Sequence, residues 1–289
     1  MIKKDNSINS NSNNNRDKLR NCKRVVVKVG TSSLTYGNGR ANLKNIEKIC
    51  RAISDEMNKG HEMILVSSGA IGIGMGKLRL SSKPELIREK QAVAAVGQCE
   101  LMSLYSRFFA SYNYPAGQIL LTRDDIEDEL TRENIINTFE TLIEKEIVPV
   151  VNENDTVSTR EIYHNGTFGD NDMLSAIVAG LINADLLILL SDISGFYDCD
   201  PHKNSNAVLI DTVEKITPEL RSCAGGTNTS RGTGGMITKL EAALFASQAG
   251  IDMVIANGRD PSVIRNILEG EKIGTMFVAG TKASHGEQS

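Results

Sequence analysis

The segment KRVVVKVG, residues 23–30, is a β-branched run that ends in a glycine, which is the pattern of a strand leading into a turn. Segments with helical spacing separate it from further apolar runs, most of them continuously apolar rather than alternating. These runs occur at residues 62–66, 118–121, 147–151, 186–190 and 253–256. Strands that are apolar on both faces and alternate with helices predict a parallel sheet covered on both sides. We therefore expect an α/β fold.

Helices are expected between these strands. After Asn42, a residue suited to capping a helix, apolar side chains recur on one face as far as Met57, and Gly60 ends the segment. The remaining helices are expected at residues 91–110, 132–144, 172–181 and 239–249, and after Pro261.

The composition is that of an ordinary globular chain. Of its 289 residues 40% are hydrophobic and 24% charged, and the net charge of -4 gives no basic footprint for nucleic acid. No apolar run reaches the ~18 residues of a membrane-spanning helix, and the Asn/Ser-rich start lacks the apolar segment of a signal peptide. We expect one domain at residues 22–280, between a disordered polar tail at 1–21 and a loose tail at 281–289.

Cysteine and histidine show no metal-site pattern. The five cysteines are odd in number and lack C-x-x-C spacing, and the four histidines are scattered. A disulfide framework or a zinc site is therefore not expected, and the expected location is the reducing cytoplasm.

Polar or glycine-rich segments follow four of the expected strands, at residues 30–33, 67–76, 152–155 and 191–197. The carboxyl ends of parallel strands meet at one edge of a sheet, and ligands bind there. These segments therefore predict one composite site.

Lys28 lies inside the first apolar strand, directly before Val29 and Gly30. A buried ammonium group needs a partner, and a bound phosphate would serve. The alternative is an edge-strand lysine with its head in water, and the spacing alone does not decide between the two.

Residues 67–76, SSGAIGIGMG, are the most glycine-rich stretch. Glycines let backbone N–H groups approach an anion closely, but they also suit a tight turn from strand to helix. The stretch is not a P-loop, because Lys77 is followed by Leu78. It is not a dinucleotide fingerprint either, because position 77 breaks that spacing.

Amides and carboxylates gather at residues 152–155, NEND, and at residues 169–172, GDND. Such groups can hold an amino acid, whose ammonium needs acceptors and whose carboxylates need donors. Helix capping is the alternative for each run alone, whereas their joint placement around one loop favours a binding site.

Residues 232–239, GTGGMITK, place three glycines and two threonines before Lys239, at an expected helix start. A helix start favours negative charge, so a lysine is unfavourable there unless an anion is bound. The pattern favours a phosphate site over the alternative, a Gly/Thr loop without function.

These motifs, in this order, resemble the amino-acid kinase family and, within it, the glutamate 5-kinases. They are KVGTS at 28–32, SSGA at 67–70, NEND at 152–155, FGDND at 168–172 and GTGGMITK at 232–239. The resemblance covers about residues 23–278. It implies a three-layer αβα sandwich around a mainly parallel sheet, with ATP over the C-terminal half and glutamate over the N-terminal half.

The resemblance also implies residue roles. Lys28 and Lys239 would contact the transferring phosphoryl group, and Asp172 would hold both lysines. The residues implied to bind glutamate are Ser68, Gly69, Ala70, Asn152, Asp155 and Asn171. Those implied to bind ATP are Lys28, Ser191, Asp192, Thr233, Gly234, Gly235, Met236, Ile237, Thr238 and Lys239. Mg2+ is expected on the ATP phosphates, with no protein ligand assigned.

The implied reaction is ATP-dependent phosphorylation of the L-glutamate side-chain carboxylate to γ-glutamyl phosphate, the first step of proline biosynthesis. A γ-glutamyl phosphate reductase would be the pathway partner, proline a feedback inhibitor, and the assembly a homodimer or homotetramer. Many bacterial relatives carry a further C-terminal domain of the PUA type, for which this chain has no room.

Three alternatives remain at this point. One is a kinase of the same family acting on aspartate, N-acetylglutamate, carbamate or a nucleoside monophosphate. Another is a non-catalytic amino-acid or nucleotide sensor on the same fold, which the presence of both Lys28 and Lys239 disfavours. The third is a dinucleotide-dependent dehydrogenase, which the missing fingerprint disfavours.

Overall fold

The chain folds around one eight-stranded sheet with the strand order β3-β4-β2-β1-β5-β7-β8-β6. The structure is a computed structural model that describes residues 15–158, 171–199, 201, 204, 206–218, 220–221 and 235–280. The strands are β1 Arg24–Val29, β2 Glu62–Ser67, β3 Ala116–Leu121, β4 Val148–Glu153, β5 Leu186–Ser191, β6 Thr212–Val213, β7 Asp252–Asn257 and β8 Thr275–Phe277. All of the strand pairs are parallel except β7 with β8. The prediction of a mainly parallel sheet is therefore confirmed.

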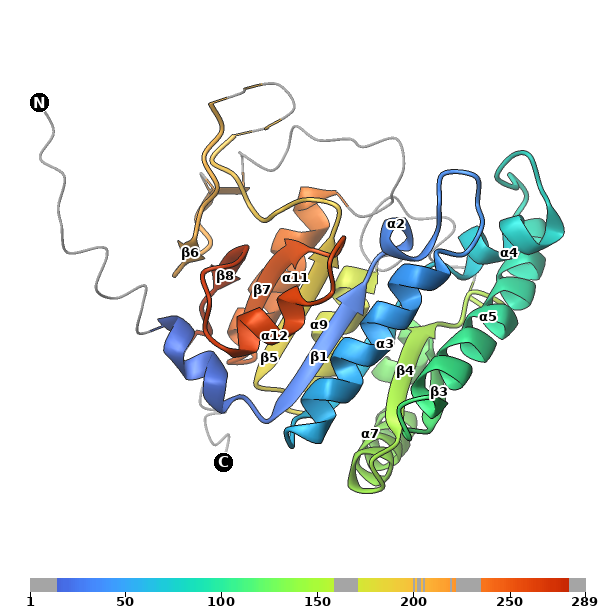
Figure 1. The fold of residues 1–289 in the computed structure, drawn as a ribbon, viewed down its shortest axis with the longest axis horizontal. Coiled ribbons are helices and arrows are strands. Elements are labelled where there is room, and N and C mark those ends of the chain that lie inside the picture. The colour runs from blue at the N-terminus through green and yellow to red at the C-terminus, as the bar shows by residue number, and fades with distance from the viewer. Residues whose placement is uncertain are drawn as a thin grey trace, which may run out of the picture.

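Helices cover both faces of this sheet (Figure 1). They are η1 Lys18–Asn21, α2 Thr31–Leu34, α3 Leu43–Asn58, α4 Ala70–Leu78, α5 Ile87–Ala110, α6 Arg123–Glu127, α7 Glu129–Glu144, α9 Asn171–Leu181, α11 Met236–Gln248 and α12 Val263–Leu268. The apolar side chains of α3, α5 and α12 join one core cluster, and those of α7, α9 and α11 join the other. The arrangement is the expected three-layer αβα sandwich.

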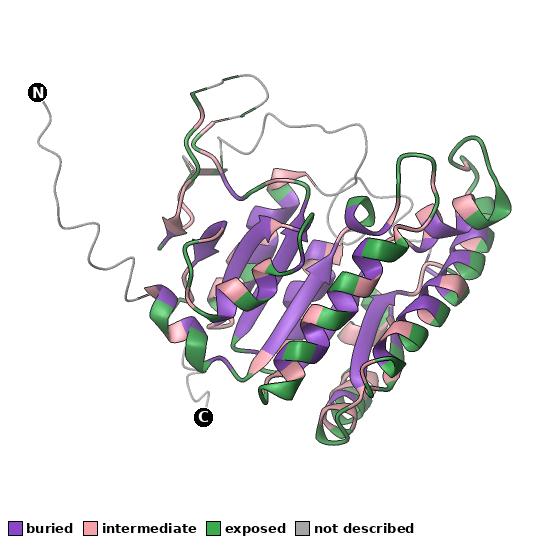
Figure 2. Ribbon diagram, viewed as in Figure 1, coloured by how far each residue is buried: buried purple, intermediate pink, exposed green. Residues whose placement is uncertain are grey.

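Alternation along β1 sends its side chains to the two cores in turn. Val25, Val27 and Val29 join the α3 side, whereas Val26 joins the α9 side. Lys28 takes the next position on the α9 side and is 7% exposed. Because β1 pairs with β2 and β5, it is a central strand, and the edge-strand alternative for Lys28 is wrong. Figure 2 shows the central strands buried and the outer faces of the helices exposed.

Several boundaries differ from the sequence expectation. Strand β4 continues through Asn152 and Glu153, which were expected to follow it. Helix α11 begins at Met236, so Lys239 is its fourth residue rather than its first. In β4, polar residues extend a strand whose apolar part alone was visible in the pattern.

The glycine-rich stretch is mostly helix. Only Gly69 takes a left-handed conformation, with φ of 97°, and α4 begins at the next residue. A Cβ at Gly74 would lie 2.1 Å from the carbonyl oxygen of Val93, and one at Gly97 would lie 1.7 Å from that of Ala70. These glycines let α4 and α5 pack backbone against backbone, so the strand-to-helix alternative describes the stretch better than a phosphate-binding loop.

Residues 15–21, expected to belong to a polar tail, are packed in the structure. Arg16 is 1% exposed, and its guanidinium donates to the carbonyl oxygens of Asp211, Glu271, Ile273 and Gly274 at 2.8–3.2 Å. The correction has a physical reason: one buried arginine can satisfy carbonyls from several loops at once, which composition does not reveal. The rest of the predicted tails, residues 1–14 and 281–289, lies outside the described residues.

Among the described residues, no helix has both the length and the apolar character needed to cross a membrane.

Candidate active site

Three charged side chains meet at the carboxyl edge of β1. Asp172 lies in the first turn of α9. Its Oδ1 forms an ion pair with Lys28 Nζ at 2.6 Å, and its Oδ2 accepts a hydrogen bond from Lys239 Nζ at 2.9 Å. Lys28 and Lys239 are 7% and 6% exposed, and Asp172 is fully buried. We call Lys28, Asp172 and Lys239 the lysine–aspartate cluster. It joins a strand and two helices that are far apart in sequence.

The charge state of the cluster follows from these contacts. Burial alone would raise the pKa of Asp172, but the two ammonium groups outweigh burial and lower that pKa to about 2. The aspartate is therefore ionised at neutral pH, and the cluster carries two positive charges and one negative. A buried group with this net charge favours the binding of an anion.

A second polar group lies beside the cluster and consists of amides. Asn171 Nδ2 donates to Ser68 Oγ at 2.9 Å and to Asn152 Oδ1 at 3.1 Å. Asn152 Nδ2 donates in turn to Gln98 Oε1 at 2.8 Å. We call these four residues the amide chain. It connects the ends of β2 and β4 with α9 and α5, so it spans the N-terminal half of the sheet edge.

The other residues expected to bind glutamate border the amide chain. Gly69 and Ala70 form the turn from Ser68 into α4, and the α4 N-terminus presents backbone N–H groups there. Asp155 follows β4 and is half-buried, and burial raises its pKa to about 6. A carboxylate whose desolvation is not offset by a cation is suited to receive one.

On the other side of β1, the residues expected to bind ATP lie at the ends of β5 and α11. Ser191 is the last residue of β5, and its hydroxyl donates to Asp192 Oδ1 at 3.1 Å. Gly235 caps α11, and Thr238 Oγ1 donates back to its carbonyl oxygen at 2.8 Å. Met236 and Ile237 form the first turn, in which Ile237 is exposed. Thr233 and Gly234 lie outside the described residues.

Most of this chain is similar in sequence to known proteins. The sequence matches the amino acid kinase family over residues 23–257. A glutamate 5-kinase from Clostridium perfringens (strain 13 / Type A) is 60% identical over 91% of this chain and 98% of its own length. A glutamate 5-kinase from Listeria monocytogenes serovar 1/2a is 53% identical over 91% of this chain and 96% of its own length.

This chain belongs to the amino acid kinase family. Solved structures agree on the fold. An isopentenyl phosphate kinase superposes with a TM-score of 0.60 at 19% identity, covering 88% of this chain and all of its own. A UMP kinase from Bacillus anthracis superposes with a TM-score of 0.57 at 16% identity, covering 90% and 97%. At these identities the likeness concerns the αβα fold alone.

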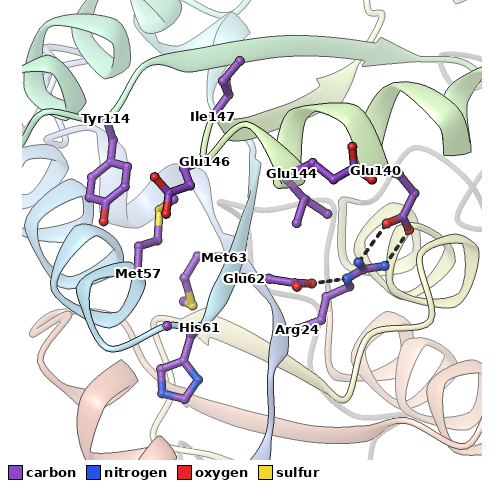
Figure 3. A pocket seen from close by; sticks show the side chains of 12 residues that line it. Arg24, Met57, His61, Glu62, Met63, Tyr114, Glu140, Glu144, Glu146 and Ile147 are labelled. Atoms are coloured by element: carbon purple, nitrogen blue, oxygen red, sulfur yellow. Dashed lines mark hydrogen bonds and ion pairs between the residues drawn. The ribbon is translucent and has the colours of Figure 1, made fainter.

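A pocket of about 390 Å³ lies where β1 and β2 begin, at the opposite end of these strands from the lysine–aspartate cluster. Figure 3 shows the side chains that line it. Its lining includes the first residues of β1 and β2, Arg24 and Glu62, together with Glu140 of α7. Arg24 is held by Glu62 at 2.7 Å and by Glu140 at 2.6 Å. None of the residues expected to bind glutamate or ATP lines it. This pocket is therefore distinct from the candidate active site.

Gln98 is the member of the amide chain that sequence reasoning missed. A signal was present: Gln98 stands on the buried stripe of α5, four residues after Ala94 and three before Leu101, both fully buried. A glutamine on such a stripe requires a buried hydrogen-bond partner. Because the segment was interpreted only by its apolar, alanine-rich composition, Gln98 was not predicted to belong to the site.

Proposed function

We propose that this chain transfers the γ-phosphoryl group of ATP to the side-chain carboxylate of L-glutamate, forming γ-glutamyl phosphate. This is the reaction of a glutamate 5-kinase, the first step of proline biosynthesis. The observation that carries the proposal is the buried lysine–aspartate cluster next to the amide chain. The 60% identity to a glutamate 5-kinase supports the choice of substrate.

The chemistry suits a site without a general base. The glutamate side chain has an ordinary pKa of ~4.3, so it arrives ionised and ready to attack. The difficulty is electrostatic, because the carboxylate must approach an anionic phosphate. Two like unit charges ~4 Å apart repel by about 4 kcal/mol at an effective dielectric of 20. The net positive charge of the cluster offsets this repulsion.

Within the cluster the three residues divide the work. Each lysine ammonium has three N–H donors, and one carboxylate oxygen of Asp172 faces each ammonium. The aspartate fixes both ammonium groups in place. Their remaining N–H donors can contact the phosphoryl group as it moves from ATP to glutamate. Lysine suits this role as a compact point charge on a flexible stem. Charge placed in advance where it is needed lowers the barrier without reorganisation.

Glutamate recognition needs acceptors for an ammonium and donors for two carboxylates. Asp155 and Asn171 offer oxygen acceptors, and Ser68 offers a hydroxyl. The backbone N–H groups at Gly69 and Ala70 provide donors at the start of α4. Asn152 serves by holding the amide of Asn171.

ATP would lie over β5 and α11, with its γ-phosphate at the cluster. Ser191 and Asp192 would line one side of the nucleotide, and residues 233–238 the other. Mg2+ is expected at this site as part of MgATP, on the phosphate oxygens. Bound there, Mg2+ would neutralise phosphate charge.

A substrate panel tests this function. ADP release is measured with MgATP and with L-glutamate, L-aspartate, N-acetylglutamate or UMP in turn. We expect release that depends on L-glutamate. Turnover with another acceptor would contradict the substrate, and folded protein that binds ATP without any turnover would favour a sensor.

The remaining predictions extend beyond the reaction. The acyl phosphate product hydrolyses readily. The resemblance to glutamate 5-kinases implies a γ-glutamyl phosphate reductase as the pathway partner. Feedback inhibition by proline, a dimeric or tetrameric assembly and a cytoplasmic location are also expected. Adding proline to the same assay tests feedback inhibition. Unchanged ADP release in the presence of proline would contradict it.

A further inference from the structure

Gln98 occupies a costly position on α5. It is 7% exposed on the buried face of the helix, and burying an amide costs free energy unless it is hydrogen-bonded. Its Oε1 accepts from Asn152 Nδ2 at 2.8 Å, but its Nε2 has no partner among the described residues. Half of its hydrogen-bonding capacity is thus unused, which argues against a role in stability alone.

The contact with Gln98 determines which way the next amide points. Each amide has a donor end and an acceptor end. Because Gln98 Oε1 engages Asn152 Nδ2, the oxygen of Asn152 faces Asn171 and accepts from its Nδ2. The same Nδ2 donates to Ser68. The orientation of the Gln98 amide therefore fixes the orientation of the Asn152 amide and, through it, that of the Asn171 amide.

One acceptor is left over at the end of this chain. Asn171 Oδ1 is shielded from water and has no hydrogen-bond partner among the described residues. An unpaired buried acceptor is costly, and a ligand that donates to it recovers that cost. The side-chain and α-carboxylates of ionised glutamate only accept hydrogen bonds, so the α-ammonium is the group of glutamate that can donate here.

We propose that Gln98 is a positioning residue for glutamate, acting through Asn152 to aim the Asn171 oxygen at the substrate α-ammonium. The inference rests on the proposed function, because it assumes glutamate as the ligand. Packing places Gln98 well for this role. Its neighbour Gly97 lies against the carbonyl of Ala70, so α5 is fixed against the same turn that carries Ser68.

Two variants separate the hydrogen bond from the bulk of the side chain. Gln98→Met keeps the length of the side chain but removes the acceptor, and Gln98→Glu keeps an oxygen that can accept from Asn152. We expect Gln98→Met to raise the KM for glutamate about tenfold or more and to leave the KM for ATP within about twofold. Gln98→Glu is expected to stay near the wild type. Gln118→Met, on an exposed position of β3, is the control for the substitution itself.

A substrate analogue tests the link to the ammonium. Glutarate keeps both carboxylates of glutamate and lacks the ammonium, so its inhibition constant is expected to be equal in the wild type and in Gln98→Met. A KM for glutamate that Gln98→Met leaves unchanged would contradict the role of Gln98. So would equal losses for glutamate and glutarate, or a Gln98→Glu variant that behaves like Gln98→Met.

Direct calorimetric titration with L-glutamate distinguishes a failure of the proposed function from a failure of the positioning role of Gln98. A wild type that binds glutamate without phosphorylating it would contradict the proposed function alone. Equal glutamate affinities for the wild type and Gln98→Met would contradict the positioning role alone. A wild type that binds no glutamate would contradict both.

Discussion

At the scale of single residues, the site depends on one carboxylate shared by two ammonium groups. Asp172 is fully buried between Lys28 and Lys239, and a lone buried ion of either sign would be costly. Together the three side chains form a stable unit with one surplus positive charge. Under the proposed function, that surplus charge would stabilise the transferring phosphoryl group.

Replacing Lys239 by alanine tests the catalytic part of this unit. Lys239→Ala is expected to lower kcat by at least ~100-fold, the scale of removing one transition-state donor. Lys77→Ala, which removes a lysine paired with Glu100 on the surface, serves as the control. Steady-state ADP release measures both, and near-normal turnover of Lys239→Ala would exclude the assigned role.

Replacing Asp172 tests how much its charge contributes to the stability of the fold. Its pKa in the folded chain, about 2, lies below the ordinary 3.8, so its stabilising effect is complete above about pH 4 and is lost as pH falls toward 2. Asp172→Asn leaves two buried ammonium groups without a counterion and is expected to destabilise the fold by roughly 3–5 kcal/mol at pH 7. The difference from the wild type in the free energy of unfolding should shrink below about pH 4. Denaturant titrations at several pH values would reveal a constant difference if this explanation is wrong.

The raised pKa of Asp155 predicts that kcat/KM for glutamate depends on pH. Burial raises its pKa to about 6, and only its ionised form can pair with the substrate ammonium. The kcat/KM for glutamate is therefore expected to fall below about pH 6, where glutamate itself does not titrate. Asp155→Asn should raise the KM for glutamate and remove this inflection. An unchanged inflection in the variant would assign it to another group.

At the scale of elements, the site depends on how closely α4 and α5 approach each other. Glycine at positions 74 and 97 removes the Cβ atoms that would keep the two backbones apart. This approach holds the turn at Ser68 and Gly69 against α5, next to the amide chain. Under the proposed function, the glycines would therefore support glutamate binding indirectly, through packing.

Gly97→Ala tests this dependence. Its Cβ would lie 1.7 Å from the Ala70 carbonyl oxygen, so the helices must separate, at an expected cost of about 1–3 kcal/mol. The KM for glutamate should rise, although alanine is the better helix former by up to about 1 kcal/mol. Gly37→Ala is the matched control, because nothing lies within 4 Å of its added Cβ. Thermal unfolding and KM values that match between the two variants would contradict the packing argument.

Elements with a strong apolar period could be predicted from the sequence, and those fixed by polar contacts could not. Helix α3 was predicted almost to the residue, because Asn42 caps it and its apolar stripe is regular. The packing of Arg16 was not predictable, since its partners are backbone carbonyls more than 190 residues away. The cluster residues were identified from their motifs, but their mutual contacts come from tertiary structure. Gln98 lay in a segment that was read only for its apolar content.

At the scale of the whole molecule, the sheet brings the two halves of the site to one edge. The amide chain lies over β2 and β4, the expected nucleotide residues lie over β5, and Lys28 on β1 stands between them. In the function that we propose, the phosphoryl group would cross from one half to the other over the lysine–aspartate cluster. The two substrates would then approach from opposite sides of β1.

The most direct test is to trap the product. The chain is incubated with MgATP, L-glutamate and hydroxylamine, which converts an acyl phosphate to a hydroxamate. We predict that γ-glutamyl hydroxamate and ADP form in equal amounts, and that both disappear with the Lys239→Ala variant. ADP formed without hydroxamate, or equal formation by Lys239→Ala, would contradict transfer of the phosphoryl group to the glutamate side chain at this cluster.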